Sequence, residues 1–506
     1  MTKHIGHNLF GLFQSRFPKD TSDVFLEHAR GELSYADLEI LSGRYAAVLK
    51  SCGVNKGDRV VVQVKKSPEA VLLYLACLRA GAVYIPLNTA YTLTEVRYFV
   101  EDAKPRLIVC DPNSKEQFVK AFTDEIAITI LTLAGDGTGS FINRALKLVP
   151  DHTIANNNAD DVAAILYTSG TTGRSKGAML THGNLSSNAL VLHDYWGWVP
   201  GDVLLHALPI FHVHGLFVAL HCALLNASKV VFHNKFDTDQ IIKALPHVTV
   251  MMGVPTFYTR LLETPDFDRH TCRNIRLFIS GSAPLLAESF NAFENLTGHK
   301  ILERYGMTEA GMITSNPYDG ERIAGSVGFA LPGVKARIAD QNGNELPYGE
   351  VGVLEIAGPN VFAGYWQMPE KTAEEFRADG YFITGDMAEM DKNRRISIVG
   401  RAKDLVISGG YNVYPKEVES IIDEMPDVIE SAVIGVPHPD FGEAVTAVIV
   451  TNDGAQIDTD TVQTFLGGKL ARFKQPKQVF IVSELPRNTM GKVQKKVLRE
   501  QYADTY

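Results

Sequence analysis

Residues 167–177 read Tyr-Thr-Ser-Gly-Thr-Thr-Gly-Arg-Ser-Lys-Gly. The apolar run 163–166 before them predicts a buried strand, and a helix is expected to begin near His182. Glycine lets backbone N–H groups approach phosphate oxygens closely, and serine and threonine hydroxyls donate further hydrogen bonds. We therefore expect a phosphate-binding loop, although a flexible Gly/Ser/Thr turn is the alternative. Its candidate residues are Thr168, Ser169, Gly170, Thr171, Thr172, Gly173 and Lys176.

The bulk composition is that of a globular protein of several domains. At 506 residues the chain is too long for a single core, so two or three domains are expected. The net charge of −9 offers no basic face for nucleic acid. The start of the chain has no apolar core of signal-peptide length, and no run approaches the length of a membrane span. The five cysteines are scattered without a zinc-like pair. These features predict a cytoplasmic protein that binds neither nucleic acid nor membrane.

The pattern along the chain predicts an α/β fold. From about residue 59 to 300, short apolar strands alternate with helical segments, which indicates doubly wound parallel sheets. Between about 326 and 400, short strands with Gly/Asn/Pro turns predict a small antiparallel β-barrel or sheet. After that come an amphipathic helix at 414–425 and a mixture of strands and helices. We expect a large N-terminal domain over 1–400 and a mobile α+β domain over 401–506.

Together with the loop at 167–177, four further blocks resemble the acyl-adenylate-forming enzymes. This superfamily includes acyl-CoA synthetases, luciferases and peptide-synthetase adenylation domains. The blocks are Tyr305-Gly306-Met307-Thr308-Glu309, Thr384-Gly385-Asp386, Gly400-Arg401-Ala402-Lys403-Asp404 and Pro486-Arg487-Asn488-Thr489-Met490-Gly491-Lys492. They occur in the family's order, and the likeness covers nearly the whole chain. The loop departs from the family at Ser175, where a proline is usual.

The resemblance implies that ATP activates a carboxylic acid with Mg²⁺ present. Attack of a carboxylate on the α-phosphorus brings negative charges together, so the site must supply positive charge. Glu309 would bind Mg²⁺, since a hard cation prefers carboxylate oxygen. Thr308 would bind the α-phosphate, and Lys492 would bridge the carboxylate and the phosphate. These three are the candidate catalytic residues; an exposed glutamate and one more surface lysine are the alternatives.

The same resemblance assigns other residues to the nucleotide. Tyr305 would offer a flat face to adenine, and Asp386 would accept both ribose hydroxyls, with Arg401 near the same sugar. For Asp386 an ordinary Gly-Asp turn is the alternative. Further candidate nucleotide-binding residues are Ser282, Ala283, Pro284, Glu303 and Arg304.

The second half-reaction would transfer the acyl group to coenzyme A. The run Ser408-Gly409-Gly410 would let a pantetheine arm pass close to the backbone. In the resembling enzymes the C-terminal domain rotates between the two steps, and Lys403 matches the hinge position. A plain hairpin turn is the alternative. A lysine acetyltransferase or deacetylase acting on Lys492 is kept as a candidate partner.

The acyl substrate is the least explicit part of the sequence. The stretch 256–262 resembles malonyl-CoA synthetases, in which the arginine that matches Arg260 is thought to bind the distal carboxylate of a small diacid. This implies malonate, with methylmalonate second, and places His212, Ser282, Met312 and Val213 around the acid. Helix geometry alone would leave Arg260 solvated. The other hypotheses are a ligase for medium-chain or aromatic acids, an enzyme that loads a carrier protein, and a non-catalytic nucleotide-binding protein.

Overall fold

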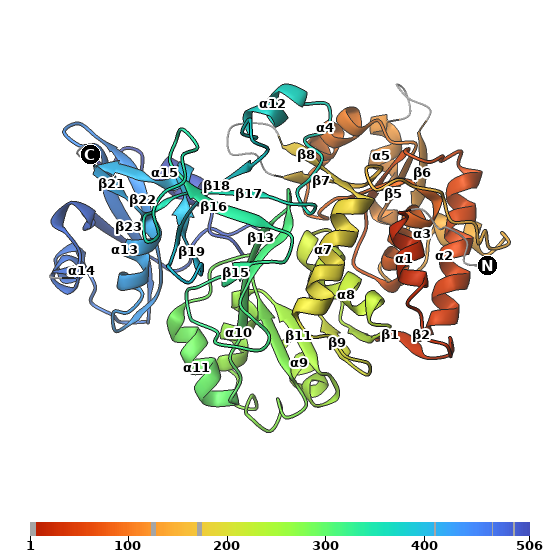
Figure 1. Ribbon diagram of the computed structural model, residues 1–506, viewed down its shortest axis with the longest axis horizontal. Helices are drawn as coiled ribbons and strands as arrows, with labels where there is room; N and C mark the ends of the chain where they lie inside the picture. The colour runs from red at the N-terminus through yellow and green to blue at the C-terminus, as the bar shows by residue number, and fades with distance from the viewer. Residues whose placement is uncertain (1–6, 123–127, 169–174, 409–410, 468, 489–490) are drawn as a thin grey trace.

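The computed structural model describes residues 7–122, 128–168, 175–408, 411–467, 469–488 and 491–506. In Figure 1 the C-terminal part, in blue, lies at the end of the molecule opposite the N-terminus. Two large sheets form the N-terminal part, a four-stranded antiparallel sheet follows, and a smaller sheet forms the C-terminal part. The residues expected at 169–173 and 409–410 lie outside the described parts, so the phosphate loop is known only by its ends.

The first large sheet has six strands and is parallel except at one edge. In spatial order they are β6 (Thr129–Thr132), β5 (Leu107–Cys110), β3 (Arg59–Gln63), β4 (Val83–Pro86), β7 (Val162–Thr168) and β8 (Lys176–Thr181). Successive side chains of β3 enter different cores: Val60 and Val62 face one, Val61 the other. The first core also contains α2 (Tyr35–Ser51) and α3 (Pro68–Ala80), and the second contains α4 (Leu93–Ala103) and α5 (Lys115–Phe122). Helices thus cover both faces, as the alternating pattern predicted.

One strand of this sheet was missed in the sequence. The phosphate loop leads from β7 into β8, which pairs antiparallel with β7, and only then does α7 (His182–Tyr195) begin. Thr168 and Lys176 are partners in this hairpin. The loop therefore joins two hydrogen-bonded strands, which fix the positions of its two ends.

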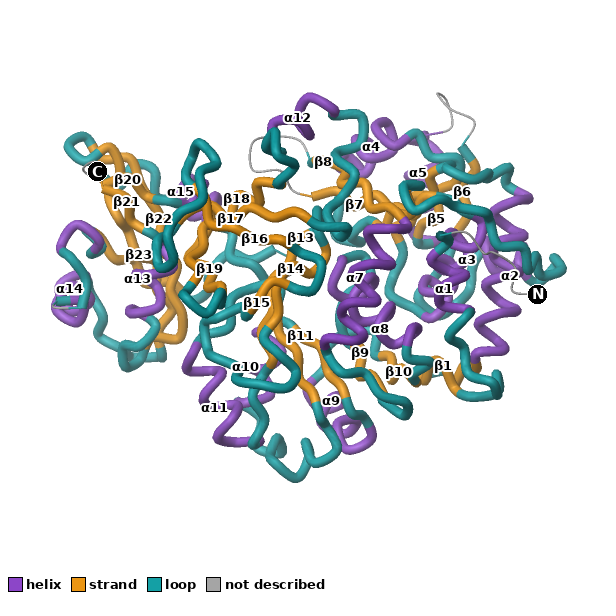
Figure 2. Tube along the Cα trace, viewed as in Figure 1, coloured by secondary structure: helices purple, strands orange, loops and turns teal. Residues whose placement is uncertain are grey.

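The second large sheet has a parallel centre and antiparallel edges. In spatial order its strands are β15 (Phe329–Ala330), β14 (Gly311–Ser315), β13 (Leu302–Met307), β12 (Leu277–Ser280), β11 (Val250–Gly253), β9 (Val203–His206), β10 (Lys229–Phe232), β1 (Val24–His28) and β2 (Gly31–Ser34). Its helices are α8 (Leu220–Leu225), α9 (Thr238–Ala244), α10 (Pro255–Leu262) and α11 (Ala287–Thr297). Helices α7 and α8 lie side by side in the core that joins the two sheets (Figure 2).

The third sheet is antiparallel and occupies the place of the expected barrel or sheet. Its strands are β16 (Lys335–Ala339), β17 (Gly352–Ala357), β18 (Phe382–Met390) and β19 (Ile396–Arg401), in that order, with α12 (Pro369–Glu374) between β17 and β18. Outside the sheets lie the short helices α1 (Leu9–Gln14) and α6 (Ser140–Ala145). Among the described helices we find no segment with the length and apolar character that a membrane span requires.

The C-terminal part has its own core around a mixed sheet. Its strands are β20 (Val406–Ser408), β21 (Tyr411–Val413), β22 (Val428–His438), β23 (Gly442–Thr451) and β24 (Gln478–Val482). Helix α13 (Pro415–Ile422), α14 (Thr459–Leu466) and α15 (Lys495–Gln501) accompany them. Val418 and Ile422, expected on the apolar face of the first helix, are both fully buried. A short helical turn at 402–404 joins this part to β19.

Candidate active site

The end of the phosphate loop is tied to an acidic cluster. Lys176, the first residue of β8, lies with its Nζ atom 2.7 Å from Glu375 Oε1 and 4.1 Å from the centre of the Tyr365 ring. The Tyr365 hydroxyl donates to Glu375 Oε2 at 2.6 Å and lies 3.2 Å from Glu309 Oε1. The loop lysine, predicted to bind phosphate, and the predicted metal carboxylate therefore belong to one cluster.

The carboxylate of Glu309 is suited to bind a metal cation. It lies in the turn between β13 and β14 and is buried, and burial raises the pKa of its carboxyl group. No group of three or more His, Cys, Asp or Glu side chains in the described residues forms a closed metal site. A lone buried carboxylate fits Mg²⁺, which is usually held by one or two carboxylates together with substrate phosphates.

Three residues far apart in the sequence meet where the ribose is expected. The Tyr305 hydroxyl donates to Asp386 Oδ2, and Arg401 Nε lies 2.9 Å from Asp386 Oδ1. Asp386 and Arg401 are register partners on β18 and β19, so the sheet itself brings the acid and the base together. Asp386 is almost fully buried. The structure thus joins three of the predicted nucleotide residues.

Lys492 extends from the C-terminal part into the same region. Burial lowers the pKa of its ammonium group to about 8, assisted by the charges of Arg401 and Arg304 and opposed by Asp386 and Glu309. These effects require all four groups to lie within electrostatic reach of the lysine. The turn that carries it is closed by paired backbone and side-chain contacts between Asn488 and Lys492.

Arg304 is the most unusual charge in the site. It is buried, and its Nε and Nη2 atoms find no hydrogen-bond partner among the described residues. Burial lowers the pKa of its guanidinium to about 9. In Arg276, the same edge of the guanidinium binds both carboxylate oxygens of Asp202. The corresponding edge of Arg304 can thus bind a carboxylate through two hydrogen bonds, and no carboxylate of the described residues binds there.

The neighbour of Arg304 on the same strand is also buried and incompletely paired. Glu303 accepts a hydrogen bond from the Leu285 N–H through Oε1 at 3.3 Å, whereas its Oε2 atom has no partner among the described residues. Burial raises the pKa of Glu303 to about 7. Such an oxygen can accept a hydrogen bond from a ligand donor such as an adenine amine.

The loop after β12 and the helix after β9 meet beside these groups. Ser282 has a left-handed backbone, with φ of 73°, and its hydroxyl lies 3.3 Å from His214 Nδ1. His214 opens the π-helix η2 (His214–Ala219), a form often found at functional sites. Burial, with Lys492 and Arg304 next in effect, lowers the pKa of His212 to about 4. Ala283, the next residue, is partly buried, and Pro284 is exposed.

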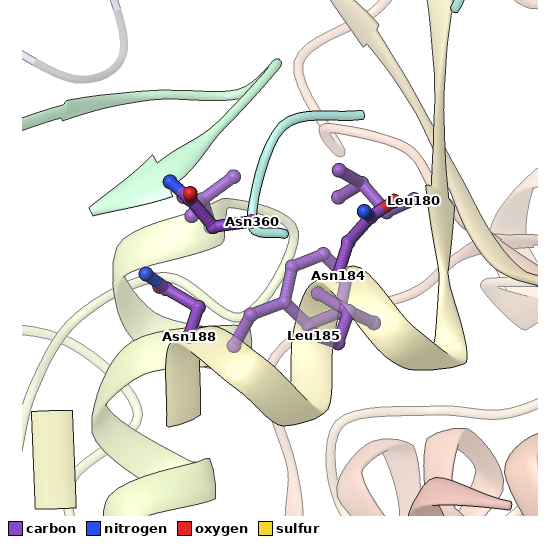
Figure 3. A pocket seen from close by; sticks show the side chains of 8 residues that line it. Leu180, Asn184, Leu185, Asn188 and Asn360 are labelled. Atoms are coloured by element: carbon purple, nitrogen blue, oxygen red, sulfur yellow. The ribbon is translucent and has the colours of Figure 1, made fainter. Parts of the chain in front are cut away.

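Met312 and Val213 are both buried in the core beneath the site. Asn188 binds both backbone groups of Met312, at 2.8 and 3.0 Å, and the Asn360 amide donates to Ala310 and Met312 carbonyls. A cavity of about 10 Å³, room for one water molecule, lies among Asn188, Asn360 and Val213 (Figure 3). Asn188 fixes β14 to α7 and Asn360 fixes it to the segment after β17, and together they set the position of Met312.

Arg260 differs from the buried arginine that a closed diacid pocket requires. It is exposed on α10, and its guanidinium makes no ion pair or side-chain hydrogen bond with the described residues. It lines a cleft of about 1150 Å³ between the N-terminal part and the turn before Lys492. The cleft is also bordered by Thr256, Gly491 and the cations Lys65, Lys66, Lys235 and Arg487.

The expected hinge lies between two ion pairs. Arg401 pairs with Asp386 on the N-terminal side, and Asp404 accepts both terminal nitrogens of Arg499 at 3.0 Å on the C-terminal side. Lys403 lies between them in the turn 402–404, with a pKa lowered by burial and by Arg401. Ser408 is buried at the end of β20, and Gly409 and Gly410 lie outside the described residues.

Sequence reasoning overlooked several members of this site. Glu375 and Tyr365 lie outside the five matching blocks, and no spacing rule connects them with Lys176. His214 was not among the candidates, and Arg304 was predicted only as a nucleotide-binding residue. The one available signal was that two charged residues, Glu303 and Arg304, follow the apolar pair Ile301 and Leu302.

The chain belongs to the AMP-binding enzyme family. That family matches residues 13–366, and the AMP-binding enzyme C-terminal domain matches residues 417–492. The mitochondrial malonate–CoA ligase of Mus musculus is 35% identical over 90% of this chain and 83% of its own length. A feruloyl-CoA synthase of an Amycolatopsis species is 34% identical over 94% and 95%.

Solved structures agree with this assignment. ATP-bound MatB from Rhodopseudomonas palustris is 55% identical, covers 99% of this chain and 100% of its own, and superposes with a TM-score of 0.97. The apo form of the same protein, with the same identity and coverage, gives 0.86. This chain therefore superposes more closely on the ATP-bound form than on the apo form.

Proposed function

We propose that this protein is an ATP-dependent acid–CoA ligase whose substrate is malonate, with methylmalonate second. It would convert malonate, ATP and coenzyme A to malonyl-CoA, AMP and diphosphate through a malonyl-adenylate. The family assignment supports adenylate chemistry. The choice of a short diacid rests on one structural observation: the Nε and Nη2 atoms of the buried Arg304 have no hydrogen-bond partner among the described residues.

The fork argues for a diacid because a buried, unpaired guanidinium is costly. Its Nε and Nη2 edge would bind the distal carboxylate in the two-point manner of Arg276 with Asp202. Lys492 would bind the reacting carboxylate, and the charge of Arg304 acts on Lys492 electrostatically. A short diacid offers one carboxylate to each of the two cations. Ferulate has no second carboxylate, so it would leave Arg304 unpaired.

In the adenylation step the residues have separate tasks. Asp386 and Tyr305 would hold the ribose and base, and Lys176 and Thr308 the phosphates. Glu309 would bind Mg²⁺, which when bound neutralises phosphate charge. Lys492 would hold the attacking carboxylate oxygen near the α-phosphorus and stabilise the charge that develops there. His212, Met312 and Val213 would line the acyl chain.

The thioester step would use the large cleft. Its lining includes the exposed cations Lys65, Lys235 and Arg260, which are suited to the phosphates of coenzyme A. Rotation at Lys403 would withdraw Lys492 and present the segment at 408–410 to the thiol. We place the domain boundary at residue 401, in line with the short turn at 402–404. A lysine acetyltransferase or deacetylase acting on Lys492 stays a prediction.

Pyrophosphate release with ATP, Mg²⁺ and a panel of acids tests the proposal. Malonate should give the highest kcat/KM, methylmalonate less, and succinate, butyrate and ferulate little. Malonyl-CoA should form only when coenzyme A is added. Equal rates with butyrate and malonate would contradict the diacid assignment, and release with no acid would contradict acid activation.

A further inference from the structure

The carboxylate of Glu375 is paired with the ammonium group of Lys176, which the nucleotide phosphates would need. Lys176 Nζ lies 2.7 Å from Glu375 Oε1, and both side chains are largely shielded from solvent. The aromatic ring of Tyr365 covers the lysine from one side. Triphosphate oxygens and Glu375 would therefore compete for the same ammonium.

Glu375 has other partners available when the lysine leaves. The Tyr365 hydroxyl already donates to its Oε2 atom, and Lys371 Nζ lies 3.5 Å from its Oε1 atom. A carboxylate with a second cation and a hydroxyl donor stays compensated after it loses Lys176. Lys176 has no such reserve, because Glu375 is its one carboxylate partner within ion-pair distance in the described residues.

We propose that Glu375 is a positioning residue that binds Lys176 while the nucleotide site is empty and passes it to the phosphates of ATP. This inference rests on the proposed function, since it assumes that ATP is the ligand of Lys176. ATP binding would exchange the Lys176–Glu375 pair for a Lys176–phosphate pair, while Glu375 turns to Lys371. Because the Lys176–Glu375 pair must break before Lys176 can bind phosphate, the apparent affinity for ATP is lowered by the free energy of that pair. In return, it keeps a shielded ammonium paired between turnovers.

The chain offers a matched control one residue away. Glu374 pairs with Lys371 at 2.8 Å and is exposed. Glu375→Gln and Glu374→Gln remove the same charge from neighbouring positions, but only the first frees Lys176. A partly shielded pair of this kind predicts a roughly two- to fivefold lower Kd for ATP in Glu375→Gln. Glu374→Gln should bind ATP as the wild type does.

Calorimetric titration with ATP, without acid or coenzyme A, measures this directly. The gain from Glu375→Gln should vanish when Lys176→Met is already present, a coupling that a general effect on stability would not produce. Unchanged or weaker ATP binding by Glu375→Gln would overturn the exchange, the latter because Glu375 would then hold Lys176 in its working position. No ATP binding by the wild type would overturn the proposed function as well.

Discussion

The guanidinium of Arg304 packs directly against Gly281, so that a Cβ atom at residue 281 would overlap its Cζ and Nη1 atoms. Gly281 follows β12 and Arg304 lies on β13, two parallel neighbours in the second sheet. The missing side chain at 281 provides the space in which the charged group is buried. The proposed acid specificity therefore depends on both residues.

Arg304→Met is expected to lose most activity on malonate and to gain relative activity on butyrate. A site built for a polar group can reject an analogue that lacks it by up to ~10⁴. Because the Nε and Nη2 atoms of this buried arginine have no partner among the described residues, its loss should leave Tm unchanged or raise it. The measurement is kcat/KM for both acids, with Arg304→Lys restoring only part of the preference, since lysine lacks the fork.

Arg260→Met in the same assay separates the two candidate arginines. If Arg260 binds the distal carboxylate, as the sequence suggested, its loss should shift the malonate-to-butyrate ratio strongly. Its exposure in the cleft leads us to expect a small change in that ratio and a higher KM for coenzyme A. A ratio that changes with Arg260 but not with Arg304 would reverse the assignment.

Gly281→Ala is expected to raise the KM for malonate while the KM for ATP stays close to that of the wild type. The added methyl group would push the guanidinium away from its position, and a displaced fork cannot form both hydrogen bonds. Kinetics with each substrate varied in turn test this. Equal increases in both KM values would mean that the change disturbs the whole loop rather than Arg304.

Lys492→Ala is expected to slow adenylation by ~10²–10³ and to spare thioester formation from supplied malonyl-AMP. The lysine charge is needed only while negative charge builds at phosphorus. The measurements are pyrophosphate exchange for the first step and malonyl-CoA formation from malonyl-AMP for the second. Equal loss in both steps would contradict the expectation that Lys492 acts only in adenylation.

The pH dependence of kcat/KM for ATP should report the same lysine. Its pKa of about 8 means that Lys492 is charged below pH 8 and loses its charge as the pH rises through that value. Adenylation should therefore fall above about pH 8, since kcat/KM follows the free enzyme. In Lys492→Arg, which stays protonated, any remaining activity should not show this fall. A fall shared by both proteins would assign it to another group.

Lys403→Pro is expected to keep near-normal pyrophosphate exchange and to form malonyl-CoA poorly. Proline fixes φ near −65°, so the rotation between the two flanking ion pairs would be blocked. Lys403→Ala, which leaves the backbone free, is the control. Wild-type rates for both steps in the proline variant would exclude residue 403 as the pivot.

Sequence motifs and hydrophobic periodicity were sufficient to predict the fold class and the family of this protein, because both signals are carried by residues close together in the sequence. The alternation of strands and helices predicted the parallel sheets, and α13 (Pro415–Ile422) lies within the amphipathic helix predicted at 414–425. The matching blocks predicted the family, which the profile over 13–366 confirms. The strand β8 was missed because Lys176–Thr181 directly follows a Gly-rich loop, and its pairing with β7 leaves no periodic signal of its own.

Tertiary structure alone decided which charges meet. Asp386 and Arg401 become neighbours through the register of β18 and β19, and Lys176 meets Glu375 across 199 positions of sequence. From the sequence, the resemblance assigned Arg260 to the distal carboxylate and Arg304 to the nucleotide, because burial, which depends on what packs around a residue, is not visible there. The sequence by itself determined the fold class and the chemical groups available. Packing determined that Arg304 is buried, with its Nε and Nη2 atoms unpaired among the described residues, and that Arg260 faces the cleft. The reason is that desolvation of a charged group depends on neighbours that are far away in sequence.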